Sequence, residues 1–213
     1  MCLGIVLKGN RTKLLRNKVA QEAAMLLYTS QEKEYKQAKQ KAAQTLRVRV
    51  LPSNLEVATE LDRIADEREG AQRREQLLRM RKEAKEILEA LKEFNPRLVG
   101  SVWRGTARRN SDIDVLGFSQ DPYQVLNQLQ DHFKFRVESS EWRSVTKEGL
   151  KESSFHINML LASGDGVEVV VRSLDCLGKI ERCETYRDVK TGLNLDQLTK
   201  ILEENPLQKF VPV

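Results

Sequence analysis

The spacing of apolar residues divides the chain into two parts. Between residues 12 and 94, apolar residues recur three or four positions apart, which places them along one face of an α-helix. The longest of these stripes runs from Leu77 to Phe94. We therefore predict that the first part of the chain forms about four amphipathic helices.

Local end signals separate the predicted helices. Thr29 with Glu32, and Ser53 with Glu56, have the spacing of a capping box, in which each residue bonds the backbone amide of the other. These pairs start the second helix, which ends near residue 45, and the third helix, which ends near residue 67. Gly70 predicts the break before the fourth helix, because glycine weakens a helix interior.

After residue 95 the pattern changes to short strand-like runs that are separated by turn residues. The predicted strands span residues 98–101, 113–118, 135–139, 155–162 and 167–172. Two further helices are predicted over residues 122–133 and 195–204. The sequence Gly164-Asp165-Gly166 predicts a hairpin turn between the last two strands.

These elements predict an α+β protein with two domains. A basic helical domain is expected over residues 1–95, and a domain built on a mixed sheet over residues 96–213. The 213 residues include 40% hydrophobic residues, enough for a sizeable core. The longest early apolar run, residues 3–7, is too short for a signal peptide or a membrane span. A cytoplasmic protein with no membrane partner is expected.

Cysteine and histidine are scarce in this chain. The three cysteines, Cys2, Cys176 and Cys183, form no CxxC pair and predict neither a disulfide framework nor a structural zinc site. His132 and His156 have apolar neighbours, as hydrogen-bonded structural histidines commonly do.

Positive charge is concentrated in the first quarter of the chain. Residues 1–49 contain 11 Lys and Arg against 3 Asp and Glu, a balance of +8, whereas residues 50–95 and 96–213 have balances of −2 and −1. A block of this kind can dock nucleic acid or another polyanion. A lysine-rich helix face that serves only solubility explains the charge equally well.

A second feature is a pair of carboxylates inside a strand-like run. Asp112 and Asp114 lie two positions apart, so they point to the same face of a strand and repel each other. A divalent cation relieves this repulsion and can clamp the phosphates of a nucleotide. Glu168, which alternates with buried valines, is the expected third carboxylate. Asp165 in the neighbouring turn is the weaker alternative.

Residues upstream of the pair suit a phosphate group. Gly100 lets phosphate oxygens approach the backbone, and Ser101 adds a hydroxyl and an amide. Arg104, Arg108 and Arg109 supply positive charge. The simpler alternative is a solvated loop in which Ser111 and Asp112 cap a turn and Asp114 pairs with an arginine.

The stretch GSVWRGTARRNSDIDVLGF, residues 100–118, resembles the signature of the DNA polymerase β-like nucleotidyltransferase superfamily. Its form is similar to that of archaeal CCA-adding enzymes and of minimal nucleotidyltransferases. The resemblance implies that Mg²⁺ or Mn²⁺ binds Asp112, Asp114 and Glu168, the three expected catalytic residues. The nucleotide-binding residues that it implies are Gly100, Ser101, Arg104 and Ser111. Glu168 departs from the usual Asp by one additional methylene.

The resemblance further implies transfer of NMP from an NTP, with ATP or CTP expected, to an acceptor hydroxyl, with release of pyrophosphate. Three hypotheses differ in the acceptor. The first is an RNA end, such as that of a tRNA, docked by the basic N-terminal helices. The second is a protein hydroxyl, as in adenylylating enzymes of the antitoxin type. The third is a non-catalytic RNA-binding module that keeps the same fold.

Overall fold

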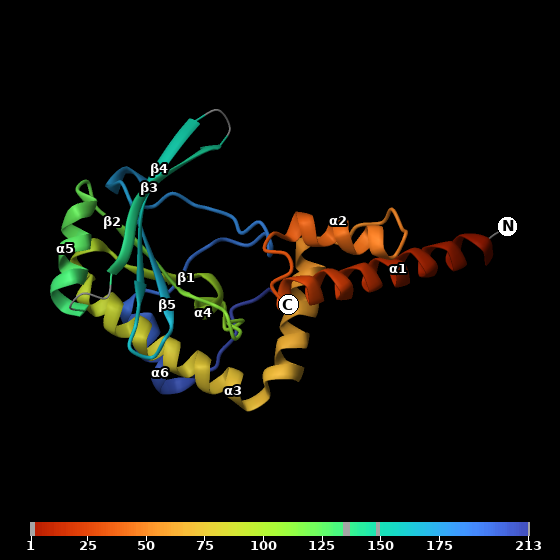
Figure 1. Cartoon of the computed structure of the whole chain (residues 1–213), viewed down its shortest axis with the longest axis horizontal. Coiled ribbons are helices and arrows are strands. Elements are labelled where there is room, and N and C mark those ends of the chain that lie inside the picture. Colours follow the sequence, from red (N-terminus) through yellow and green to blue (C-terminus); the bar gives the residue numbers. More distant parts are fainter. Residues whose placement is uncertain (1–2, 134–136, 148–149, 213) are drawn as a thin grey trace. The chain divides into compact units, whose positions relative to one another are not determined.

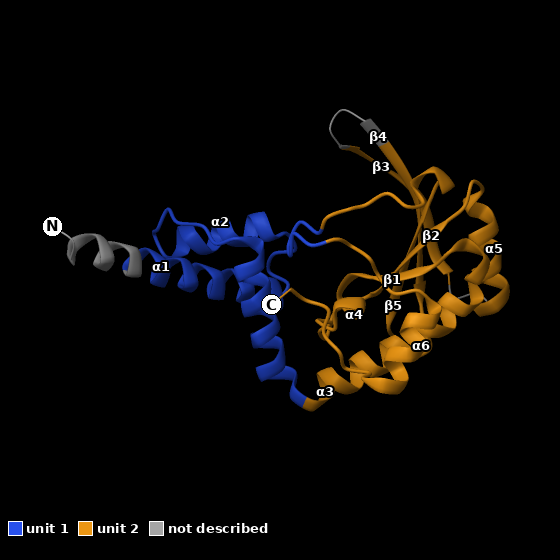
Figure 2. Ribbon diagram, turned by 180° about the vertical axis from the view of Figure 1, so that it is seen from behind, with its two compact units in different colours: residues 1–70, 183–188 blue, residues 71–182, 189–213 orange. Residues whose placement is uncertain are grey.

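The computed structural model describes residues 3–133, 137–147 and 150–212. They divide into two units (Figure 2): Met1–Gly70 with Cys183–Asp188, and Ala71–Arg182 with Val189–Val213. The boundary lies at Gly70, whereas the change of periodicity predicted it at residue 95. Gly70 has φ 54° and ψ −123° inside a continuous helical stretch, a conformation that glycine adopts without the steric cost of a Cβ atom.

The first unit contains helices α1 (Leu3–Tyr28) and α2 (Tyr35–Thr45) and the beginning of α3 (Asn54–Ala90). The two halves of α3, on either side of Gly70, correspond to the predicted third and fourth helices. Alanines dominate the core where α1 and α2 meet, and small side chains permit a close approach of two helices. The buried alanines of these helices are Ala20, Ala23, Ala24, Ala38, Ala42 and Ala43.

One of the two predicted capping boxes is confirmed. The Ser53 amide donates to Glu56 Oε2 at 2.7 Å, and the Glu56 amide donates to Ser53 Oγ at 3.1 Å. The prediction for Thr29 was wrong, because its hydroxyl donates back to the Met25 carbonyl at 2.9 Å and α2 starts only after Glu34. A Thr hydroxyl can satisfy the end of the preceding helix as readily as the start of the next.

The second unit is built on a five-stranded mixed sheet with the strand order β1-β2-β5-β4-β3 (Figure 1). Strands β2 and β5 are parallel and the other neighbours are antiparallel. The strands are β1 (Arg97–Val99), β2 (Ile113–Phe118), β3 (Val137–Lys147), β4 (Leu150–Leu160) and β5 (Gly166–Arg172). The helices of this unit, besides the second half of α3, are α4 (Gly100–Arg104), α5 (Pro122–Phe133) and α6 (Leu195–Glu204), with short 3₁₀ turns η1 (Lys92–Phe94) and η2 (Leu174–Cys176).

This arrangement confirms the predicted α+β fold with a mixed sheet. The bounds of β2, α5 and α6 agree with the predicted ranges. The strand predicted over residues 98–101 ends at Val99, because Gly100 turns the chain into α4. The strand predicted over residues 135–139 begins in a region outside the described residues, and β3 continues to Lys147.

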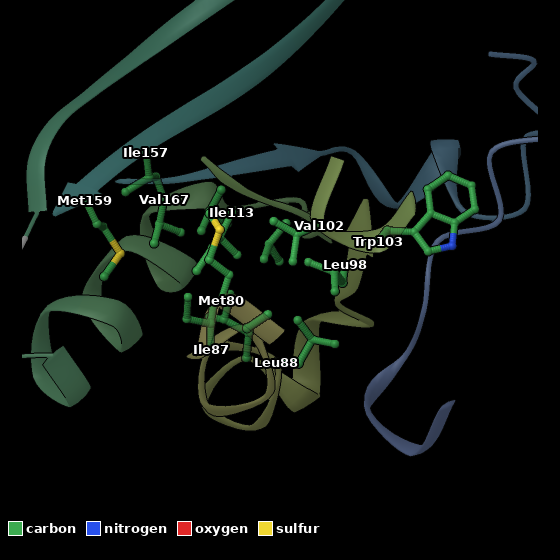
Figure 3. Close-up of a cluster of buried hydrophobic side chains, with 14 of the residues drawn as sticks. Met80, Ile87, Leu88, Leu98, Val102, Trp103, Ile113, Ile157, Met159 and Val167 are labelled. Atoms are coloured by element: carbon green, nitrogen blue, oxygen red, sulfur yellow. The ribbon is translucent and has the colours of Figure 1, made fainter. Parts of the chain in front are cut away.

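Helices cover one face of the sheet. Ile113, Ile157 and Val167 point from three strands toward Met80 and Ile87 of α3 (Figure 3). Residues 71–94 therefore pack against the sheet rather than with the first unit. Alternate positions point to the second face. We call this second face, defined by Asp114, Leu116, His156, Glu168 and Val170, the carboxylate face.

No helix among the described residues is both long enough and apolar enough to cross a membrane. This observation agrees with the high charge content of the helical segments, of which α3 is an example.

Candidate active site

Gly100 brings the start of α4 against Asp114. Val99 pairs with Asp114 across β1 and β2, and Gly100 follows with φ +68°. A Cβ atom at Gly100 would lie 1.8 Å from Asp114 Oδ2. Both the backbone conformation and the space beside Asp114 therefore require glycine, and the first turn of α4 lies next to this carboxylate.

Replacement of Gly100 by Ala is expected to destabilise the protein by more than the backbone conformation alone explains. Gly164 is the matched control, because it also has a positive φ (+86°) but has nothing within 4 Å of an added Cβ. Gly164→Ala is expected to lower the free energy of unfolding by about 1–2 kcal/mol, because alanine is strained at a positive φ. Gly100→Ala is expected to lower the free energy of unfolding by about 1–3 kcal/mol more than Gly164→Ala does, because the added Cβ atom forces Asp114 to move. Equal free energies of unfolding for the two variants, measured in urea, would contradict the close contact.

A second glycine makes room for the other aspartate. A Cβ atom at Gly166 would lie 2.5 Å from Asp112 Oδ1, so the first residue of β5 accommodates the Asp112 carboxylate. Asp114 pairs with Glu168 in the parallel register of β2 and β5. Asp112 immediately precedes β2, and the structure thus places Asp112, Asp114 and Glu168 at neighbouring positions along the adjacent strands β2 and β5.

The two aspartates lie in an unfavourable electrostatic environment. Burial, followed by the charges of Glu168 and Asp112, raises the pKa of Asp114 to about 7. Loss of hydration and the charge of Glu168 also raise the pKa of Asp112. Within the described residues, neither a hydrogen bond nor a positive charge contributes to offset these effects. Carboxylate oxygens are the ligands that Mg²⁺ prefers in proteins, so this pair fits a divalent cation.

The raised pKa of Asp114 predicts that the metal-free protein loses stability as the pH rises. Its ordinary value is 3.8, so between about pH 4 and pH 7 the folded state binds more protons than the unfolded state, and the stability falls. In EDTA at about pH 8, Asp114→Asn is expected to unfold at a higher temperature than the wild type. Mg²⁺ is expected to raise the melting temperature of the wild type and not that of the variant.

Glu168 differs from the aspartates in having partners. Its Oε1 accepts a hydrogen bond from Arg143 Nη1 at 2.9 Å and lies 2.9 Å from His156 Nδ1. His156 Nε2 in turn lies 2.9 Å from Ser154 Oγ, and Arg143 also pairs with Glu141. A polar chain therefore runs along the carboxylate face from β3 through β4 to β5.

These partners affect how a cation could bind. Among the described residues, no group of three or more His, Cys, Asp or Glu side chains is arranged to hold a metal ion. The two aspartates have no hydrogen bond or cation among the described residues, whereas Glu168 Oε1 is engaged by Arg143 and His156. A cation on Asp112 and Asp114 would gain the third carboxylate if Glu168 turned away from Arg143.

Asp165, the alternative third carboxylate, has a different role. Its side chain is buried and forms a two-point ion pair with Arg79, in which Nε donates to Oδ2 at 2.8 Å and Nη2 donates to Oδ1 at 2.9 Å. This pair ties the turn before β5 to α3. The geometry thus favours Glu168 over Asp165 as the third member of the site.

Two of the predicted nucleotide-binding residues make contacts within the fold. Arg104 is buried, lies over the Trp103 ring at 4.2 Å, and donates from Nη1 to the Phe210 carbonyl at 2.8 Å. Ser111 closes a short loop, because its hydroxyl accepts from the Arg108 amide at 3.0 Å. The Arg104 guanidinium thus contacts the C-terminal segment, whereas Gly100 and Ser101 begin the helix beside Asp114.

Arg143 and His156 are members of this site that the sequence pattern did not reveal. The apolar neighbours of His156, Phe155 and Ile157, predicted a structural role for it, but they point to the other face of the strand. Arg143 meets Glu168 across two strand pairings. The alternation of residues along β4 could have revealed the position of His156, because it places His156 on the face of the sheet that does not form the core.

The site thus consists of a mixed sheet that carries Asp112 and Asp114, with a short helix beginning at Gly100 beside Asp114. Residues 79–164 match the family model described as the nucleotidyltransferase domain. The match covers less than half of the chain. A comparison with the curated proteins gave no match.

Solved structures that are similar to the chain include the GLD-2/RNP-8 complex and Cid1. The GLD-2/RNP-8 complex has 17% sequence identity and a TM-score of 0.32 over 50% of this chain and 34% of that chain. Cid1 bound to the UTP analog UMPNPP has 16% identity and a TM-score of 0.31 over 48% of this chain and 32% of that chain. The part of these proteins that the match covers is about a third of their length.

Proposed function

We propose that the protein transfers NMP from an NTP to a hydroxyl group of RNA and that the reaction depends on a divalent cation. The observation that carries the proposal is the pair Asp112 and Asp114, whose carboxylates lie beside Gly166 and Gly100 respectively, without a counter-charge among the described residues. Such a pair is costly in a folded protein unless a ligand compensates it. Mg²⁺ or Mn²⁺ would neutralise the carboxylates and the phosphate charge.

Each residue of the site has a separate role in the reaction. Asp112 and Asp114 hold the cation, and Gly100 and Ser101 receive the triphosphate at the start of α4. The acceptor oxygen bonds to the α-phosphorus while the bond from that phosphorus to the bridging oxygen of the β-phosphate breaks, so pyrophosphate leaves. Glu168, on the strand beside Asp114, accepts the proton of the acceptor hydroxyl.

Charge supports RNA as the acceptor. The segment of residues 1–49 has a balance of +8, and a segment of this charge attracts a polyanion. The neutralisation of phosphates by lysine and arginine would hold an RNA chain without a need for base recognition.

The acceptor is identified by labelling. The purified protein is incubated with each α-labelled NTP, Mg²⁺ or Mn²⁺ and total cellular RNA, and labelled RNA is separated from labelled protein on one gel. Label in RNA that is absent with Asp112→Asn/Asp114→Asn is the expected result. Label on protein instead would establish the adenylylating alternative, and binding of RNA with no label in either fraction would favour a non-catalytic module.

A further inference from the structure

A pocket of about 570 Å³ opens at the edge formed by β1 and β2. Arg97 of β1 and Leu116 of β2 are paired across the two strands, and both line the pocket together with Phe118. Leu116 follows Asp114 by two positions, so its side chain lies on the same face, roughly 7 Å further along the strand. The pocket therefore continues the row of carboxylates. Its other lining residues come from the same unit.

The lining of the pocket combines apolar surface with positive charge. Leu177 is 50% exposed and Ile180 is 80% exposed, which leaves two large apolar side chains at the pocket in contact with solvent. The cations of the lining are Lys92, Arg97, Lys179 and Lys190, and Asp196 is its one acidic residue among those the structure describes. Apolar surface beside several cations matches a nucleotide, which has a flat base and an anionic phosphate.

Two of the lining lysines have long contacts with carboxylates, and Lys179 also bonds Cys176 of the same lining. Lys179 Nζ lies 3.5 Å from Glu152 Oε1, and Lys190 Nζ lies 3.8 Å from Glu181 Oε2. Both lysine side chains are about half exposed, and long, exposed pairs of this kind contribute little free energy. Exchange of these carboxylates for a phosphate group would therefore cost little.

The register of β1 and β2 indicates whether the pocket binds the NTP or a nucleotide of the acceptor. Val99, which leads into α4, is paired with Asp114, whereas Arg97 at the pocket is paired with Leu116. The start of α4 and the pocket thus lie on opposite sides of Asp114 along the sheet. In an in-line displacement the leaving and the attacking oxygens are opposite each other across the phosphorus. If the triphosphate lies at α4, the pocket is on the side of the acceptor.

We propose that this pocket binds a nucleotide of the RNA acceptor strand next to the reacting hydroxyl, an inference that rests on the proposed transfer of NMP to RNA. The base lies against Leu116 and Ile180, and the phosphate is bound by Lys179 and Lys190. The pocket is thereby distinct in role from the start of α4, which receives the triphosphate of the NTP.

The test measures the affinity of the full chain for fluorescently labelled single-stranded oligoadenylate by anisotropy. Lys179→Glu/Lys190→Glu is expected to raise the Kd at least about tenfold. The slope of log K against log salt concentration is expected to fall by about 0.7 for each phosphate that these lysines neutralise in the wild type. Lys179→Arg/Lys190→Arg is expected to retain the affinity. Lys82→Glu/Lys200→Glu is the control for the same change of net charge, because both lysines are exposed and lie outside the pocket lining. Its Kd is expected to be unchanged.

Binding of labelled NTP, measured with the same proteins, separates the outcomes. The pocket variant is expected to bind NTP with unchanged affinity. Weakened NTP binding with unchanged RNA binding would overturn the acceptor assignment, and unchanged binding of both would overturn the pocket itself. Asp112→Asn/Asp114→Asn is expected to bind RNA normally. If RNA binding depends on Lys179 and Lys190 but the wild-type protein transfers no NMP, the proposed function is contradicted. The assignment of the pocket to RNA would then still stand.

Discussion

Asparagine at both Asp112 and Asp114 is expected to lower the rate of NMP transfer by about a thousandfold or more, which corresponds to a barrier higher by roughly 4 kcal/mol. The amides keep the shape of the carboxylates beside Gly100 and Gly166 but lose the two charges that bind the cation. Without the cation, the charge that develops on the phosphates is no longer stabilised. Initial rates with saturating Mg²⁺ and labelled NTP measure the effect.

The same variant tests whether the loss is chemical rather than structural. Its circular dichroism is expected to match that of the wild type, and its melting temperature in EDTA to equal or exceed it, because the repulsion between the carboxylates is removed. Asp131→Asn provides the control, since Asp131 is exposed on α5 and contributes nothing to the site. Retention of a tenth or more of the wild-type rate by the double variant would rule out a cation on these residues.

Arg81→Met is expected to produce the largest loss of stability, about 3–5 kcal/mol. Arg81 is fully buried and donates to four carbonyls, those of Val102, Trp103, Pro206 and Gln208, at 2.7–3.2 Å. Burial lowers its pKa to about 10, so the guanidinium stays charged at neutral pH. Methionine fills a similar volume but leaves all four carbonyls without this donor.

The position of Arg81 also predicts an effect on the nucleotide. Two of its acceptors, Val102 and Trp103, belong to α4, and the other two belong to the C-terminal segment. Arg81→Met is therefore expected to raise the KM for NTP under conditions where the variant is still folded. Urea unfolding measures the stability, and Arg81→Lys, which keeps the charge but not the planar fork, is expected to be intermediate. A loss below about 1 kcal/mol would contradict the role assigned to these hydrogen bonds.

The parts of the structure that the sequence predicts well are local. Strand β2 and helices α5 and α6 follow from periodicity and from nearby end signals, such as Asn194 and Gln197, which form the capping box of α6. The residues around Asp114 come from a short stretch between Gly100 and Phe118. Their proximity depends on one strand pair, β1 with β2, and so the motif predicts it.

The parts that the sequence did not predict depend on contacts between distant segments. The partners of Glu168 are set by the register of three strands, and the contacts of Arg81 and Arg104 with the C-terminal segment span more than a hundred residues. The apolar stripe between Leu77 and Phe94 predicts a helix but not the surface it covers. The compact units therefore divide at Gly70 rather than at residue 95, because the stripe packs against the sheet.

The most direct test of the central claim compares two labels on the same nucleotide. The NTP that gives the strongest signal is supplied with the label on either the α-phosphate or the γ-phosphate, together with Mg²⁺ and RNA, and the RNA and the released phosphates are analysed. We expect that the α-label enters RNA in equal amount to the pyrophosphate released, and that the γ-label appears in pyrophosphate alone. Transfer of the γ-label to the acceptor, or incorporation without pyrophosphate, would contradict nucleotidyl transfer by this protein.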